Sequence, residues 1–118
     1  MLVAGIDIGS LTVEVVLMDG DKITYSIIMP TGSNSKRSAE KAMETALNAV
    51  NLKKENLNFC IATGYGRISV DFADKRITEI ACHARGAHYW DSNVRTVIDI
   101  GGQDSKVISL NEKGKVLD

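Results

Sequence analysis

The stretch Val97-Ile98-Asp99-Ile100-Gly101-Gly102-Gln103-Asp104-Ser105-Lys106 decides the fold, because the chain carries a similar stretch near its start. There the sequence reads Val3-Ala4-Gly5-Ile6-Asp7-Ile8-Gly9-Ser10, so that the two Asp-Ile-Gly units begin at positions 7 and 99. In each stretch, a short apolar run with strand propensity leads to an aspartate and then to a glycine. The repeat predicts that the chemistry of this protein takes place at these two turns.

The composition is that of an ordinary globular chain with the length of one domain: 118 residues, 44% hydrophobic and 25% charged. A net charge of -1 and the lack of a Lys/Arg stripe argue against nucleic acid or an anionic membrane as the partner. No apolar run reaches the length of a membrane span, and no basic region precedes the first one, so we expect a cytoplasmic protein. Cys60 and Cys82 form no CxxC pair, which favours two reduced thiols over a disulfide or metal framework.

The order of the expected elements indicates an α/β protein. Residues 2–8, 12–18 and 22–29 predict an antiparallel meander, with a type I′ turn at Asp19-Gly20. A helical apolar stripe predicts a helix over 35–51 with Ser35 as its N-cap, followed by a strand at 57–63. Asp74 is expected to cap a second helix ending near residue 89, and residues 94–100 to pair with 103–110. Such an order predicts a mixed sheet with helices on its faces.

The two Asp-Ile-Gly turns have the residue types of a phosphate site. A glycine in a tight turn lets backbone N–H groups approach phosphate oxygens, and an aspartate before the turn suits a Mg²⁺ ion that keeps most of its waters. One such turn alone is usually an ordinary hairpin, but two similar copies favour a site that holds nucleotide phosphates from both sides of a cleft. Neither turn matches the P-loop or the Rossmann fingerprint.

Three other sets of residues carry weaker signals. His83 and His88 are five positions apart and do not share a helical face, which favours structural or surface roles over metal binding. Arg67 is interpreted either as a phosphate or partner contact or as a solvated loop arginine. Tyr89 and Trp90 are interpreted as a lid over the core, with an aromatic patch that faces a partner as the alternative.

Four motifs, the last of which contains the opening stretch, make the prediction more specific. They are Ala62-Thr63-Gly64-Tyr65-Gly66-Arg67, the run from Ala73 to Ile80, the run from Cys82 to Ala87, and the run from Thr96 to Lys106. Together they resemble the BadF/BadG/BcrA/BcrD type ATPases, the activators of 2-hydroxyacyl-CoA dehydratases and benzoyl-CoA reductases. This resemblance covers essentially the whole chain and implies the ribonuclease-H-like fold of the actin, sugar-kinase and heat-shock-chaperone ATPases. Residues 1–92 would then form a first nucleotide-binding domain, and residues 93–118 the opening strands of a truncated second domain.

The resemblance also implies an activity and its residues. Members of the family are dimeric ATPases with one 4Fe-4S cluster at the subunit interface, and ATP hydrolysis drives a low-potential electron into the partner dehydratase or reductase. Carried onto this chain, Asp7 and Asp99 are the expected catalytic acids and hold Mg²⁺ mainly through water, with ATP or ADP as the nucleotide. The expected nucleotide-binding residues are Gly9, Ser10 and Thr12 in the first turn and Gly101, Gly102 and Gln103 in the second.

The chain departs from the family pattern in two ways. Leu11 and Glu14 stand where the family's first hairpin usually has threonine and lysine, and an acid that faces the site would weaken its attraction for phosphates. The chain also stops before the cluster cysteine and the glycine-rich adenosine loop of the family. We therefore assign it no iron-sulfur ligand, leave open whether it is an enzyme, and expect little or no ATP hydrolysis from the chain alone. The alternatives are a non-catalytic interaction or scaffold module of the same fold and a sugar-type kinase of the superfamily.

Overall fold

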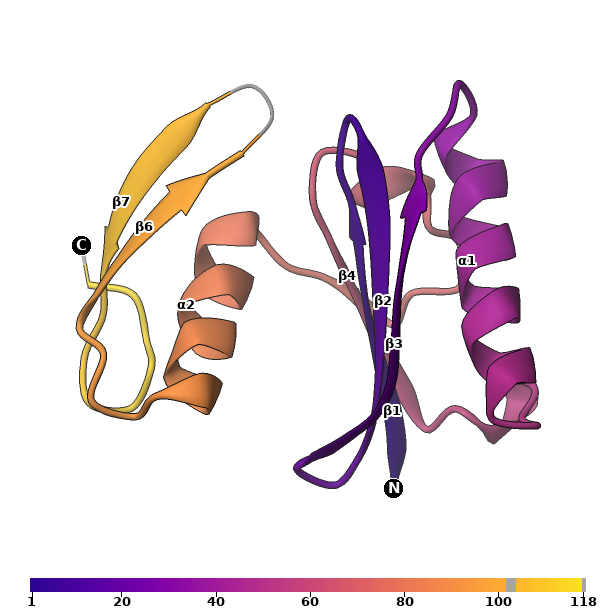
Figure 1. The fold of residues 1–118 in the computed structure, drawn as a ribbon, viewed down its shortest axis with the longest axis horizontal. Helices are drawn as coiled ribbons and strands as arrows, with labels where there is room; N and C mark the ends of the chain where they lie inside the picture. The colour runs from indigo at the N-terminus through magenta and orange to yellow at the C-terminus, as the bar shows by residue number, and fades with distance from the viewer. Residues whose placement is uncertain (102–103, 118) are drawn as a thin grey trace. The chain divides into compact units, whose positions relative to one another are not determined.

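The computed structural model describes residues 1–101 and 104–117. Their contacts divide the chain into two compact units, Met1–Arg76 and Ile77–Asp118. The second helix, α2 (Glu79–Trp90), belongs to the second unit together with the strands that follow it (Figure 1). The domain boundary expected after residue 92 stays a prediction.

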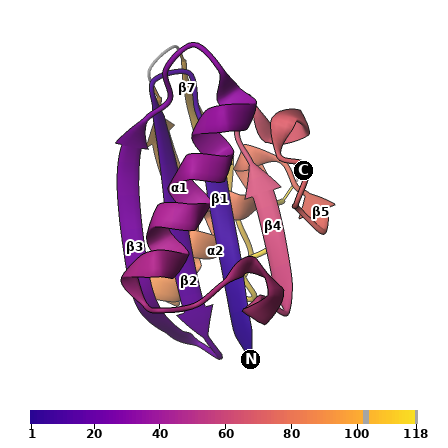
Figure 2. The same cartoon turned by 90° about the vertical axis from the view of Figure 1, so that its right-hand side faces the viewer.

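The first unit is a mixed five-stranded sheet with one helix on its face. Its strands are β1 (Leu2–Ile8), β2 (Thr12–Asp19), β3 (Lys22–Pro30), β4 (Phe59–Thr63) and β5 (Lys75–Arg76), in the spatial order β3-β2-β1-β4-β5. β1, β2 and β3 form the predicted antiparallel meander, whereas β4 lies parallel to both β1 and β5. α1 (Ser35–Ala49) lies across one face of this sheet (Figure 2). The predicted fold class is confirmed.

The core of the first unit lies between α1 and the sheet. Alternate residues of β1 and β2 point to the helix because side chains along a strand alternate between the two faces. The apolar stripe of α1 meets them, as its spacing predicts. The fully buried members of this core include Ile6, Ile8, Val13, Val15, Leu17, Ala39, Ala42, Met43, Ala46 and Leu47.

Local capping and turn geometry differ from the sequence predictions at two places in this unit. Asn34, and not Ser35, caps α1, because its side chain accepts a hydrogen bond of 3.0 Å from the backbone N–H of Arg37. The β2–β3 turn has Gly20 and Asp21 at its centre, since Asp19 pairs with Lys22. Only Gly20, with φ of 63°, has a positive φ there, which is the type II′ pattern and not type I′.

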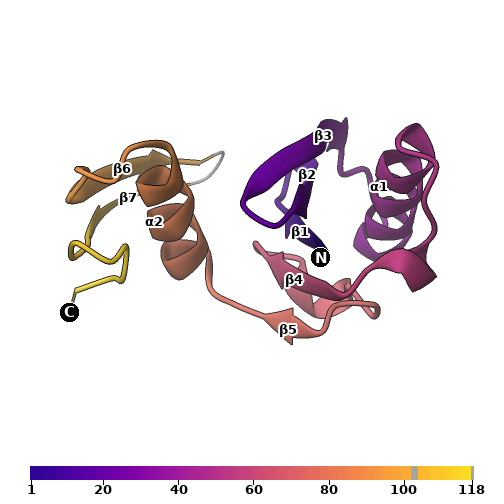
Figure 3. The ribbon, with the colours of Figure 1, turned by 90° about the horizontal axis from the view of Figure 1, so that it is seen from below.

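The second unit is built from one helix and a two-stranded hairpin. β6 (Thr96–Ile100) and β7 (Ser105–Ser109) pair in antiparallel register, and α2 lies against them (Figure 3). Ala84 of α2 is fully buried and packs with Ile108 and Leu110 in a small core of their own. The pairing of these strands around the Gly101 turn is as predicted.

The cap and the end of α2 overturn two expectations. Thr78, and not Asp74, is the N-cap, because its hydroxyl accepts from the N–H of Ala81 at 3.4 Å. The carboxylate of Asp74 instead accepts from the backbone N–H of Cys60 at 2.7 Å. Tyr89 and Trp90 are 45% and 76% exposed, so they are not a lid over the core.

Among the described residues, no helix has the length and apolarity that crossing a membrane requires.

Candidate functional site

The first Asp-Ile-Gly turn joins β1 to β2 by a tight hairpin. The N–H of Gly9 donates to the carbonyl oxygen of Thr12 at 2.9 Å and closes the loop. Asp7 lies directly opposite Glu14 on β2, so both carboxylates stand on the same face of the sheet. The hydroxyl of Thr12 donates to the Glu14 carboxylate, which places the predicted phosphate ligand in contact with the unexpected acid.

Thr31 holds this hairpin in place, and sequence reasoning missed it. Its buried hydroxyl donates to the carbonyl oxygen of Gly9 at 2.9 Å, and its N–H donates to the carbonyl oxygen of Leu11 at the same distance. These two bonds fix the backbone on both sides of Ser10. A single threonine after Pro30 gives no signal in the sequence that could have shown this.

The loop that follows β4 lies directly against Asp7. Gly64 has a φ of 92°, and a Cβ atom added there would overlap Oδ1 of Asp7 and the carbonyl oxygen of Ile8. The N–H of Gly66 donates to the carbonyl oxygen of Ile8 at 2.9 Å. Thr63 pairs with Asp7 in parallel register and is buried. The Thr63-Gly64-Tyr65-Gly66 motif therefore forms one wall around the first aspartate.

Arg67, at the end of this loop, is bound within its own segment. Its guanidinium donates from Nη1 to the carbonyl oxygen of Gly64 at 2.9 Å. Arg76 in turn donates to the carbonyl oxygens of Arg67 and Val70. The two arginines stabilise the loop beside Asp7, and neither interpretation of Arg67 made from the sequence includes that contact.

The second Asp-Ile-Gly turn has the same closure as the first. The N–H of Gly101 donates to the carbonyl oxygen of Asp104 at 2.7 Å, and Asp99 lies directly opposite Lys106 on β7. Oδ2 of Asp99 lies 2.6 Å from Nδ1 of His83 on α2. Gly102 and Gln103, the other two predicted ligands of this turn, lie outside the described residues.

The two hairpins match position by position. In the first hairpin, Gly9 follows Asp7 by two positions and donates to the carbonyl oxygen of Thr12, three positions later. In the second hairpin, Gly101 follows Asp99 and donates to Asp104 with the same spacing. Glu14 lies opposite Asp7, and Lys106 lies opposite Asp99. Each comes two positions after the residue whose carbonyl oxygen closes the turn. The internal repeat is therefore structural as well as sequential. The charge differs at two matched positions, because Thr12 corresponds to Asp104 and Glu14 corresponds to Lys106.

The two cysteines have different surroundings. Cys60 is buried in the core of the first unit, and burial raises the pKa of its thiol to about 11, with a smaller effect from the Asp74 carboxylate. Cys82 lies on α2 and is partly exposed. Within the described residues, His, Cys, Asp and Glu side chains form no group of three that could hold a metal ion directly.

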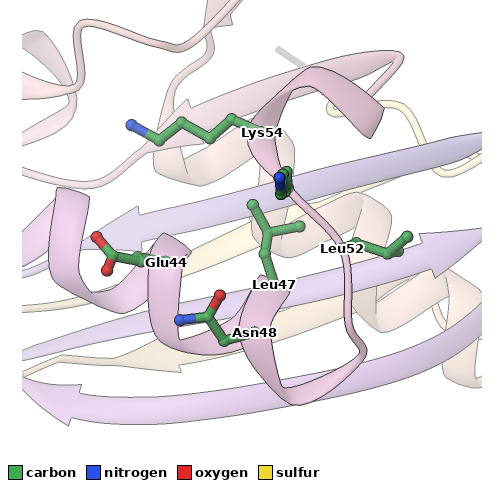
Figure 4. Close-up of a pocket in the computed structure, with 6 residues that line it drawn as sticks. Glu44, Leu47, Asn48, Leu52 and Lys54 are labelled. Atoms are coloured by element: carbon green, nitrogen blue, oxygen red, sulfur yellow. The ribbon is translucent and has the colours of Figure 1, made fainter.

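A hollow of about 300 Å³ lies in the first unit, at the carboxyl end of α1 (Figure 4). Its lining combines Leu47 and Leu52 with polar side chains, and Lys54 beside it pairs with Glu40 and lies over the ring of Phe72. With these partners, Lys54 stabilises the packing of the segment after α1. The hollow contains none of the residues of the two Asp-Ile-Gly turns.

Comparison with known proteins agrees with this geometry. The sequence matches the family described as the BadF/BadG/BcrA/BcrD ATPase family over residues 4–118. The chain belongs to this family. A relative named activator of lactoyl-CoA dehydratase, from Anaerotignum propionicum, is 42% identical over 117 residues, which cover 98% of the chain and 45% of the relative.

Solved structures of the family superpose closely on the chain. Component A of the (R)-2-hydroxyglutaryl-CoA dehydratase from Acidaminococcus fermentans gives a TM-score of 0.93 at 38% identity, covering all of this chain and 46% of that one. The activator of the 2-hydroxyisocaproyl-CoA dehydratase from Clostridium difficile, with bound ADPNP, gives 0.90 at 36% identity and covers 44% of that chain. A hexokinase from Thermus thermophilus shares the fold alone, with a TM-score of 0.68 at 16% identity. The chain thus spans somewhat less than half the length of the relatives it matches.

Proposed function

We propose that this chain is the N-terminal part of an ATPase that activates a 2-hydroxyacyl-CoA dehydratase by driving a low-potential electron into it. The observation that carries the proposal is the pair of matching Asp-Ile-Gly hairpins in a chain whose relatives are dehydratase activators. That one relative binds ADPNP, an ATP analogue, supports ATP as the nucleotide. A benzoyl-CoA reductase is the second candidate partner, because a subunit of such an enzyme is also a relative, at 32% identity.

The proposed roles follow from the hairpin geometry. Gly9, Ser10 and Thr12 in the first turn, and Gly101, Gly102 and Gln103 in the second, would bind phosphate oxygens through backbone N–H groups and hydroxyls. Asp7 and Asp99 would hold the waters of a Mg²⁺ ion. Each described hairpin offers one such carboxylate beside its turn, and Mg²⁺ is usually bound by one or two carboxylates together with the substrate phosphates. The donors therefore fit the ion, which neutralises phosphate charge when bound.

Cys60 does not fit the iron-sulfur cluster that the family resemblance implies. Cluster ligands are thiolates, whereas Cys60 is a buried thiol of raised pKa inside the core. We therefore derive no step through a cluster from this chain, and the homodimer stays a prediction. We also propose that the chain alone hydrolyses little ATP, since it spans less than half of the activators.

The experiment that tests this function supplies the segment by which the activators are longer than this chain. The chain is fused in register to the remaining C-terminal part of the lactoyl-CoA dehydratase activator, and ATP hydrolysis and activation of the dehydratase are measured. We expect the fusion to be active, and Asp7→Asn and Asp99→Asn each to lower the rate at least a hundredfold, as loss of a positioned electrostatic group does. Asp21→Asn, at the opposite end of the sheet, is the matched control and should keep the rate.

Two results would contradict the proposal. A folded fusion that neither hydrolyses ATP nor activates the dehydratase would remove the assigned function. Calorimetry that shows micromolar binding of Mg-ATP by the chain alone would show instead that its site is already complete.

A further inference from the structure

One contact in the second unit has no place in the roles assigned so far. Nδ1 of His83, on α2, lies 2.6 Å from Oδ2 of Asp99, on β6, with the two side chains 31% and 18% exposed. An ionised carboxylate only accepts hydrogen bonds, so the imidazole must carry its proton on Nδ1 and donate it. The sequence spacing of the two histidines pointed to structural or surface roles, and nothing in it linked His83 to Asp99.

We propose that His83 is a positioning residue for Asp99, and this rests on the proposed role of Asp99 in holding a hydrated cation. By binding Oδ2, the imidazole fixes the rotation of the carboxylate and leaves Oδ1 to accept from the cation's waters. Within the described residues, Asp99 accepts a side-chain hydrogen bond only through Oδ2. Partners that orient a metal-binding carboxylate in this way typically change metal affinity 10- to 100-fold when they are removed.

A purely structural role would make the contact a clamp between α2 and the hairpin. Other groups already fasten α2 to the segment that follows it. Ala84 packs against Ile108 and Leu110 in a closed apolar cluster. Arg85 donates to the carbonyl oxygen of Lys113 at 3.1 Å, and Nε2 of His88 lies 2.8 Å from the carbonyl oxygen of Glu112. Loss of the His83 contact should therefore leave the helix docked and change mainly the carboxylate.

Lys106 makes the orientation of Asp99 more important. It lies directly opposite Asp99 on β7, on the same face, and its ammonium lies 3.9 Å from the Asp104 carboxylate. A carboxylate that can rotate freely beside a lysine can turn to the lysine and away from a cation. The hydrogen bond from His83 restricts that rotation from the side of α2.

The test uses the full chain and Mn²⁺ as a paramagnetic substitute for Mg²⁺. Broadening of the amide signals of Ile100 and Gly101 in nuclear magnetic resonance spectra reports a cation near Asp99, and Asp99→Asn gives the background. His83→Asn keeps a donor close to the position of Nδ1, whereas His83→Leu removes it. His88→Asn is the matched control, because it alters a histidine on the same helix that bonds to a backbone carbonyl. Far-UV circular dichroism checks that each variant is folded.

We expect the apparent Mn²⁺ affinity to fall about tenfold or more in His83→Leu, and to stay within about threefold of the parent in His83→Asn and His88→Asn. Equal affinity in the parent and His83→Leu would overturn the positioning role while leaving the proposed function intact, as would a folded His83→Asn as weak as His83→Leu. If the parent shows no broadening beyond that of Asp99→Asn, Asp99 binds no cation in the chain without nucleotide, and the positioning role fails. The metal role in the proposed function, in which phosphates complete the site, is tested separately by Asp99→Asn in the fusion.

Discussion

Replacing Gly64 by alanine should strongly destabilise the first unit. A φ of 92° is unfavourable for a residue with a Cβ atom, at a cost of about 1–2 kcal/mol. The added Cβ would also overlap Asp7 Oδ1 and the Ile8 carbonyl oxygen, and would lie 2.8 Å from the Ile8 carbonyl carbon. Because part of that obstruction is backbone of the central strand, relief requires strand movement, and overpacking of this kind costs about 1–3 kcal/mol. We therefore expect a loss of about 2–5 kcal/mol in the free energy of unfolding.

Urea unfolding followed by far-UV circular dichroism measures this loss. Gly5→Ala is the matched control in the same unit, because a Cβ atom at Gly5 would meet nothing within 4 Å. Its free energy of unfolding should stay within about 0.5 kcal/mol of the parent. Fluorescence of Trp90, the single tryptophan, reports the second unit separately. If Gly64→Ala were no less stable than Gly5→Ala, the close approach of the loop to Asp7 would be refuted.

Three further changes test other parts of the structure. Glu14→Lys, which gives the first hairpin the charge that Lys106 has in the second, should tighten Mg-ATP binding by the full-length fusion roughly tenfold, measured by calorimetry; unchanged affinity would show that position 14 does not sense the phosphates. Ellman's reagent at pH 8 should label Cys82 and leave Cys60 unreacted in the native chain. The pKa of Cys60 is raised to about 11 from the usual 9.0, which favours the native state below pH 9. This contribution to the free energy of unfolding should decline as the pH rises through 11. In urea unfolding, Cys60→Ala should remove that part of the pH dependence. Thr78→Ala should destabilise the second unit by about 1 kcal/mol in fluorescence-monitored unfolding, unless the cap of α2 lies elsewhere.

The sequence predicts most elements of this fold because their signals are local, but it wrongly includes the short strand β5 in the second helix. The period of two in β1 and β2 and the stripe of α1 each depend on residues within one element. The helix caps were placed wrongly for the same reason. Ser35 and Asp74 are suitable capping types, but neighbouring residues of equal aptitude, Asn34 and Thr78, fill those positions, and Asp74 is taken by a bond to β4.

The site was predictable only where the chain repeats itself. The spacing of Asp7 and Asp99 within their turns is visible in the sequence, and the structure gives both turns the same closure. What surrounds them depends on contacts between distant segments. Thr31 reaches Gly9 across 22 positions and His83 reaches Asp99 across 16, and neither pairing follows from any periodicity.

The division at residue 76 also bears on how the chain is made. All five strands of the first unit and α1 lie within Met1–Arg76, so the sequence of this unit is synthesised completely before that of the second unit begins. At translation rates of about 5–20 residues per second, residues 77–118 follow roughly 2–8 s later. The β6–β7 ribbon is then stabilised by a helix that precedes it in synthesis, so neither unit has to wait for a segment that is translated later. Each aspartate turn thus belongs to a unit whose own residues are sufficient to form its sheet or hairpin, so the units can fold in the order of their synthesis.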